Sequence, residues 1–180
     1  MNHRITGTDV KSNWEGLMNQ EQDTLERIRN AFRTFCRGER VEGRAQLFAI
    51  WEELGPEGDI FHRTVVAHYL ADSEDDPSGE LEWDLRALEV ANELTDDVAE
   101  SYPSTPAVRA FLPSLHLNLA DDYRRMGVFE KARLHADLGS ELSRGLGIDA
   151  YSQTVRAGLA RVDTQIEARD QGPAIVFDLD

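Results

Sequence analysis

The fold is decided by residues 116–142, which read HLNLADDYRRMGVFEKARLHADLGSEL. Apolar side chains recur at helical spacing on both sides of Gly127, and glycine readily adopts the backbone conformation that ends a helix. Before the glycine, the large and small apolar residues Leu119 and Ala120 are followed by Tyr123. A small residue such as Ala120 lets two helix backbones approach closely. The stretch therefore predicts a helical hairpin, two helices packed together around a tight turn.

Helical periodicity extends over most of the remaining chain. Residues that commonly cap helices stand before several of the apolar runs: Ser12, Asp59, Asp76 and Asp149. The pattern predicts seven helices, over about residues 13–37, 41–54, 60–71, 77–94, 105–126, 129–145 and 150–166. Only the end of the chain, AIVFDLD, has a composition that allows a strand. The expected fold class is all-α.

Two places interrupt this regular pattern. Pro113 lies inside the run that begins at Thr105, and a proline inside a helix is expected to kink or restart it. The stretch TDDVAESYPSTPAVRAF, residues 95–111, is longer than a simple connection between two helices needs. Either the preceding helix is extended there, or an extra turn lies between two hairpins.

The overall charge argues against one broad class of partner. The chain has 180 residues, with 19 Lys and Arg against 34 Asp and Glu, so its formal net charge is −15. A surface of this sign repels the phosphate backbone of nucleic acids. We therefore expect no nucleic-acid partner.

Cysteine content and hydropathy indicate the cellular setting. Cys36 is the one cysteine of the sequence and cannot form an internal disulfide, which fits a reducing compartment. Its place in AFRTFCRG suggests packing at the end of an apolar helical face. No apolar run approaches the roughly 20 residues that cross a bilayer, and the first residues do not resemble a signal peptide. We expect a cytoplasmic protein without membrane contact.

The sequence shows no pattern typical of a catalytic or metal site. None of the histidines pairs with another at the helical spacing of a zinc site: His3, His62, His68, His116 and His135. The acidic stretch DSEDDPSGE has proline where a calcium-binding loop needs glycine, so it is interpreted as a solvated connector. No pair of carboxylates stands out from the general acidity. We expect neither an enzyme nor a cofactor or metal.

Residues 113–146 resemble one tetratricopeptide repeat. The resemblance rests on a large and small apolar pair, an aromatic residue, a glycine at the turn, a second aromatic residue and an alanine at the helix crossing: Leu119, Ala120, Tyr123, Gly127, Phe129 and Ala132. A weaker match covers about residues 24–146, where Val66 and Ala67 repeat the large-small pair. Such repeats stack helical hairpins on one another.

The resemblance implies one domain over residues 1–180, an α-α superhelix of about three tetratricopeptide-like hairpins with a C-terminal capping helix. Residues 1–12 are expected to be a flexible N-terminus. Residues 171–180 form a C-terminal tail with a run of apolar residues after Pro173. We expect this tail to dock on its own chain or on a second copy, with its carboxylates near Arg124 or Arg125; the alternative is a mobile motif for another protein.

In tetratricopeptide proteins, one side of each first helix lines a concave groove. The residues that correspond to this side, and that are therefore the candidate binding residues, are Thr64, His68, Ser114, Leu117, Asp121, Arg124 and Arg125. Two arginines in an acidic protein would attract a carboxylate or a peptide C-terminus. Alternatively, the arginines pair with Asp121, Asp122 and Glu130 on an ordinary solvated face.

Two classes of function follow from this interpretation. The first is an adaptor or scaffold that binds a protein or peptide in the groove. The second is a regulatory module that senses a small ligand, or that forms a homodimer through its last helix. The sequence does not identify the partner or the ligand.

Overall fold

The computed structural model describes residues 23–173, and over that range every regular element is a helix. The predicted all-α class is confirmed. The chain divides into two compact units, the first ending at Glu53 and the second beginning at Leu54, where the sequence predicts one continuous domain. The boundary lies beside Gly55, which has a φ of 59° and ends the helix before it.

The first unit contains a helical hairpin. One helix covers residues 23–36, and α2 is Arg40–Leu54. A Cβ atom added at Gly43 would collide with the backbone of Phe35, so glycine allows the two helices to approach closely. Arg27 donates a hydrogen bond of 2.9 Å to Glu53 across the hairpin. The part of the first predicted helix before residue 23, and the N-terminal residues 1–12, lie outside the described residues.

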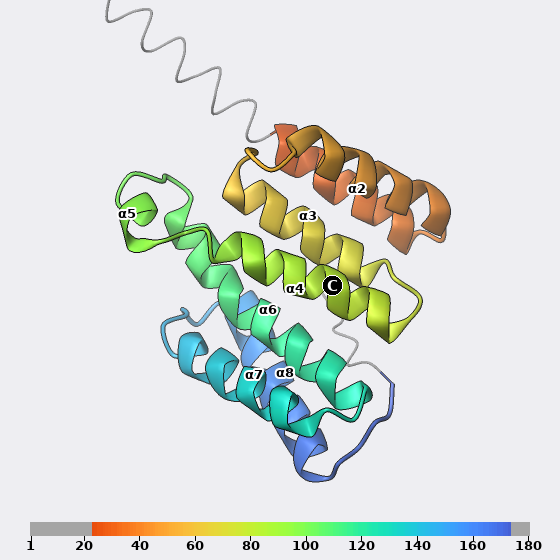
Figure 1. Cartoon of the computed structure of the whole chain (residues 1–180), viewed down its shortest axis with the longest axis vertical. Helices are drawn as coiled ribbons and strands as arrows, with labels where there is room; N and C mark the ends of the chain where they lie inside the picture. The colour runs from red at the N-terminus through yellow and green to blue at the C-terminus, as the bar shows by residue number, and fades with distance from the viewer. Residues whose placement is uncertain (1–22, 174–180) are drawn as a thin grey trace, which may run out of the picture. The chain divides into compact units, whose positions relative to one another are not determined.

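The second unit contains the other helices: α3 (Ile60–Asp72), α4 (Pro77–Ala91), α5 (Asp96–Ala99), α6 (Thr105–Arg125), α7 (Phe129–Ser143) and α8 (Ala150–Glu167). Three predicted caps are confirmed, because Asp59, Asp76 and Asp149 each accept hydrogen bonds from backbone N–H groups in the first turn that follows; the fourth, Ser12, lies outside the described residues. Helices α3 and α4 form one hairpin and α6 and α7 another, with α6 packed against α4 (Figure 1).

The hairpin of α6 and α7 turns where the sequence predicts. Gly127 has a φ of 75°, a conformation that favours glycine. Ala120 and Ala132 are fully buried between the helices. Gly139 has the same role further along α7, since a Cβ atom there would lie 3.2 Å from the Cβ of His116. Helix α8 then covers the hairpin as the predicted C-terminal cap, with Val162 fully buried in the shared core.

Pro113 lies inside helix α6. The sequence predicts a kink or a restart at Pro113, and helix α6 runs through this residue without interruption, which rules out the restart. Proline removes one N–H donor, and the carbonyl that it leaves unpaired belongs to the exposed Arg109, where water can satisfy it.

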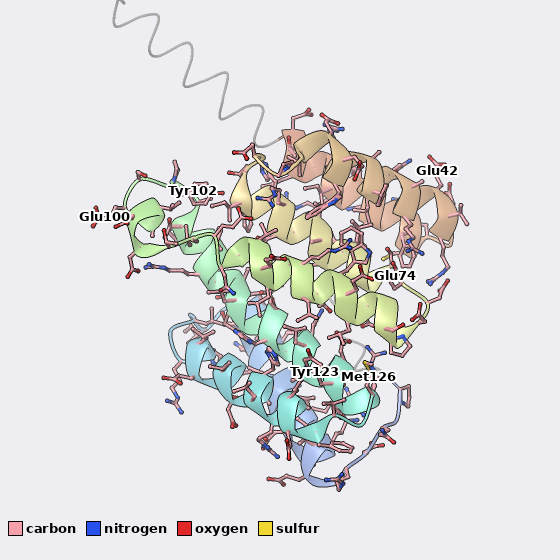
Figure 2. The ribbon with its side chains drawn as sticks, viewed as in Figure 1. Glu42, Glu74, Glu100, Tyr102, Tyr123 and Met126 are labelled. Carbon is pink, nitrogen blue, oxygen red and sulfur yellow. The ribbon has the colours of Figure 1, made fainter. Side chains whose placement is uncertain are left out.

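The long connection between α4 and α6 contains an extra short helix, α5, which is the extra turn that the sequence allows there. Tyr102, labelled in Figure 2, accepts a hydrogen bond from the backbone N–H of Phe61 and donates one to Asp59, which ties this connection to the start of α3.

The close crossing of α6 and α7 gives the first testable prediction. Replacing Ala132 with Leu should lower the free energy of unfolding by about 1 to 3 kcal/mol, because the fully buried site has no room for a larger side chain. The measurement is the denaturant midpoint. Ala157→Leu on the exposed side of α8 is the matched control and should change the midpoint little. Equal midpoints for Ala132→Leu and the parent would contradict the prediction.

Candidate functional site

The structure buries most of the residues that the sequence assigns to a groove. Five of the seven are buried, namely Thr64, Ser114, Leu117, Asp121 and Arg124, whereas His68 and Arg125 keep some exposure. Helix α8 covers part of this side of α6. Leu117 packs into the core that α6 shares with α8, and the hydroxyl of Tyr151 on α8 lies 2.9 Å from that of Ser114. Little of this surface is left for direct contact with a partner.

Arg124 holds the C-terminal segment in place. Its side chain is fully buried and pairs with Asp121 at 2.7 Å. The same guanidinium donates hydrogen bonds to the backbone carbonyls of Asp170, at 2.7 Å, and of Gly172 and Pro173, at 3.2 Å. The start of the predicted tail therefore docks on Arg124, through carbonyl groups. The remainder of that tail, residues 174–180, lies outside the described residues.

The interpretation of Arg124 and Arg125 as part of a solvated face is wrong. Their expected pairing with Asp121 and Asp122 is present, but the side chain of Arg124 is fully buried and that of Arg125 is only 10% exposed. The further partner of Arg125 is Glu80 of α4, at 2.6 Å.

This burial allows a test of Arg124. Arg124→Lys should lower the free energy of unfolding by about 2 kcal/mol or more, because an ammonium cannot reproduce the forked contacts of a buried guanidinium. The conservative control is Arg86→Lys, whose parent side chain pairs with Glu82 on the surface and should matter by less than about 1 kcal/mol. Chemical denaturation of both variants measures the difference, and equal effects would contradict the structural role.

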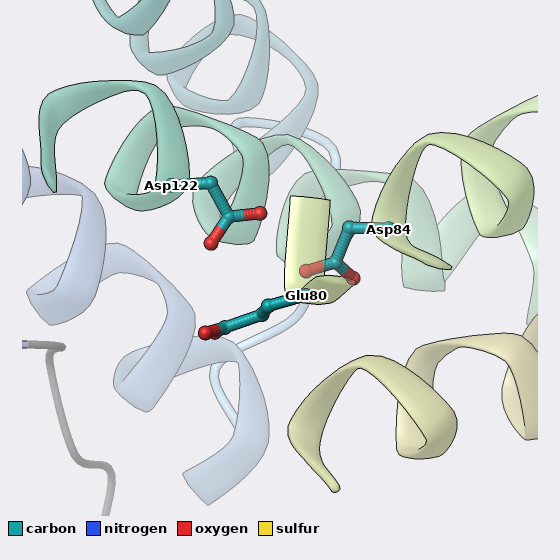
Figure 3. Close-up of side chains that lie close together, drawn as sticks. All are labelled: Glu80, Asp84 and Asp122. Atoms are coloured by element: carbon teal, nitrogen blue, oxygen red, sulfur yellow. The ribbon is translucent and has the colours of Figure 1, made fainter. Parts of the chain in front are cut away.

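Three carboxylates that lie far apart in the sequence meet beside these arginines. Glu80 and Asp84 share one face of α4, four residues apart, and Asp122 faces them from α6 (Figure 3). One oxygen from each carboxylate lies within 4.8 Å of the others. Asp84 and Asp122 are fully buried, whereas the side chain of Glu80 is 21% exposed. We call these three residues the acidic cluster.

Arg125 is the cation that contacts the acidic cluster most closely. Its guanidinium lies 2.6 Å from both Glu80 and Asp122 and bridges α4 and α6. This single charge does not compensate both acids. Burial, together with the charges of Asp84 and Glu80, raises the pKa of Asp122 to about 10. Burial also raises the pKa of Glu80, although Arg125 opposes that effect.

His68 and Asn118 complete the polar contact on the side of α3. The amide nitrogen of Asn118 lies 3.2 Å from the His68 ring and 3.4 Å from Asp84. The ring also lies 3.6 Å from Asp84 and from Asp72. Burial disfavours the charged ring, but the two carboxylates outweigh it and raise the pKa of His68 to about 9.

Sequence reasoning missed the acidic cluster, although part of the signal was present. Glu80 and Asp84 stand at the i and i+4 positions of a predicted helix, which places them on one face. Asp122 falls three residues after Leu119, on the apolar side of its own helix. Their meeting depends on how α4 packs against α6. Glu80 also belongs to the acidic stretch that was interpreted as a solvated connector, an interpretation that is wrong for this residue.

A second polar contact lies inside the hairpin of α6 and α7. The Nδ1 atoms of His116 and His135 are 3.0 Å apart, and the His135 ring stacks on Tyr123. The two histidines are 19 residues apart, so no helical spacing links them; the turn at Gly127 brings them together. Burial, helped by His135, lowers the pKa of His116 to about 4, and burial together with Lys131 lowers that of His135.

This histidine pair predicts a pH dependence of stability. A pKa of His116 that falls from 6.5 to about 4 on folding means that the unfolded chain binds more protons in that window. The stability from the neutral pair is complete above the unfolded value and is lost as pH falls toward 4. Thermal melting of the parent should therefore weaken more between about pH 7.5 and pH 5 than melting of His116→Gln, which cannot titrate there. Parallel losses in the two proteins would contradict this assignment.

Comparison with known proteins gave no match: no protein-family model, no curated protein and no solved structure is significantly similar to the chain. Among the described helices, none has the length and apolar character needed to cross a membrane.

Cys36 differs from its predicted setting. The sequence suggests that it packs on an apolar face, but the residue is exposed at the end of the helix that covers residues 23–36. The apolar positions that precede it are the buried ones, including Phe35.

Proposed function

We propose that this chain is a tetratricopeptide-like module of the cytoplasm that binds a protein or peptide partner. The architecture supports the repeat interpretation: each unit contains helical hairpins, and small residues stand where helices cross closely. The lone cysteine supports the proposed compartment. Partner binding is supported by one observation above all, an exposed stripe of leucines on α7.

The leucine stripe consists of Leu134, Leu138 and Leu142, spaced four residues apart on α7. Their exposed fractions are 55%, 37% and 39%. Residues at this spacing lie on one face of a helix, and the opposite face of α7 already packs against α6 and α8 through Ala132 and Ala136. Contiguous exposed apolar side chains commonly mark an interaction surface, and this arrangement suits an amphipathic helix of a partner.

In this proposal most of the predicted groove residues have a structural role and do not contact the partner. Because Thr64, Leu117 and Arg124 are buried, we assign them to holding the hairpins together. His68 and Arg125 are the members of the set that keep some exposure, so they are the groove positions that a peptide carboxylate could approach.

The alternative function, a ligand-sensing or dimerising module, also has a specific observation in its favour. The buried acidic cluster is a place where a small charged ligand could be held. A homodimer would use the leucine stripe more readily than the last helix, because Leu159 and Val162 on α8 already face α6 and α7.

The test compares the leucine stripe with a matched exposed leucine. The double substitution Leu134→Ser and Leu138→Ser should abolish recovery of a defined partner by affinity capture from cells that carry the protein. Leu85→Ser on α4 removes a leucine of similar exposure, 40%, and should leave recovery unchanged. Light scattering of the purified proteins identifies a homodimer, which supports the alternative. Capture of the same proteins by the parent and the double variant would contradict the proposed surface.

A further inference from the structure

The acidic cluster contains two carboxylate oxygens that have no hydrogen-bond partner. Asp84 Oδ2 and Asp122 Oδ2 are buried and receive no donor from any described residue. Both side chains are fully buried, and Figure 3 shows the three carboxylates of the cluster turned toward the same space between α4 and α6. A buried carboxylate oxygen without a donor is costly, and a bound ion is one way in which proteins offset that cost.

The protein supplies fewer positive charges to these oxygens than three ionised carboxylates require. The cluster carries three carboxylates, and Arg125 supplies one positive charge in direct contact with Glu80 and Asp122. His68 adds a second positive charge only when it is protonated. Arg124 does not help, because it is engaged by Asp121 and by the C-terminal carbonyl groups. With all three carboxylates ionised and His68 protonated, the cluster therefore lacks one positive charge, which a proton on Asp122 supplies when no ion is bound.

We propose that Glu80, Asp84 and Asp122 form a binding site for a hard divalent cation. Carboxylate oxygens are the ligands that Ca²⁺, Mg²⁺ and Mn²⁺ prefer, and the cluster offers no nitrogen or sulfur ligand. The ligand oxygens lie within 4.8 Å of one another. Ca²⁺ has longer bonds and a more flexible coordination geometry than Mg²⁺, so Ca²⁺ requires the smaller rearrangement.

The residues around the cluster allow an ion to enter and hold the carboxylates in position. Glu80 is the partly exposed member of the cluster, so an ion enters from its side, while the fully buried Asp84 and Asp122 form the floor of the site. Arg125 contacts both Glu80 and Asp122, which fixes the two carboxylates that come from different helices. This site is independent of the leucine stripe on α7, so failure of either proposal leaves the other standing.

Titration of the full-length, metal-depleted protein with CaCl₂, MgCl₂ and MnCl₂ tests the site. Calorimetry should show one ion bound per chain, with a dissociation constant below about 1 mM, the weak end of the range for protein calcium sites. Saturating ion should also raise the melting temperature, because an ion that binds only the folded state stabilises it. Absence of both signals with all three ions would overturn the proposal.

The variants are chosen so that failure to fold cannot imitate loss of the site. Asp122→Asn replaces a carboxyl whose charged form is disfavoured by burial and by Asp84 and Glu80, so the metal-free variant should melt no lower than the parent while its ion affinity falls at least about tenfold. Glu80→Gln, at the partly exposed position, should lose ion affinity in the same way. This variant tests the cation site if Asp122→Asn proves unstable. Glu82→Gln, an exposed acid on the same helix, is the control and should bind as the parent does. Unchanged affinity in Glu80→Gln would overturn the proposal.

Discussion

The contact between α4 and α6 is the constraint on which the second unit depends, because it joins the two hairpins through buried charge. Arg125 reaches from α6 to Glu80 on α4 while also pairing with Asp122 on its own helix. Arg124, the preceding residue, holds the segment after α8. Two adjacent arginines therefore fix both the neighbouring hairpin and the C-terminal cap to α6.

Joining two hairpins through buried charge costs desolvation free energy. Buried ion pairs pay a large desolvation cost, and an apolar contact of the same size would often be at least as stable. The cost is visible at Asp122, whose pKa is raised to about 10 by burial and by its acidic neighbours. Perturbed pKa values of this kind occur in structural ion-pair networks and are also frequent at sites that bind charged ligands. For this reason the acidic cluster, more than the predicted groove, is the chemically distinctive part of the second unit.

Much of the fold was predictable because its signals are local. The caps at Asp59, Asp76 and Asp149 are read from single residues, and the turn at Gly127 from a glycine between two apolar runs. The candidate site was less accessible, because it depends on contacts across helices. The helical wheel places Arg124 on a groove, but the surface that covers it comes from residues 170–173, which are 46 or more positions away. The contact of Glu80 and Asp84 with Asp122 could not be predicted for the same reason, because it depends on how two helices pack.

The most direct test of the acidic cluster is to locate an ion in crystals. Mn²⁺ has the oxygen-ligand preference of the other hard cations and is detected by its anomalous X-ray scattering. We expect an anomalous peak between Glu80, Asp84 and Asp122 in crystals of the full-length protein grown with MnCl₂, with carboxylate oxygens at coordination distance. Clear electron density for the three carboxylates in this arrangement, with no anomalous peak between them, would contradict the assignment of a cation site.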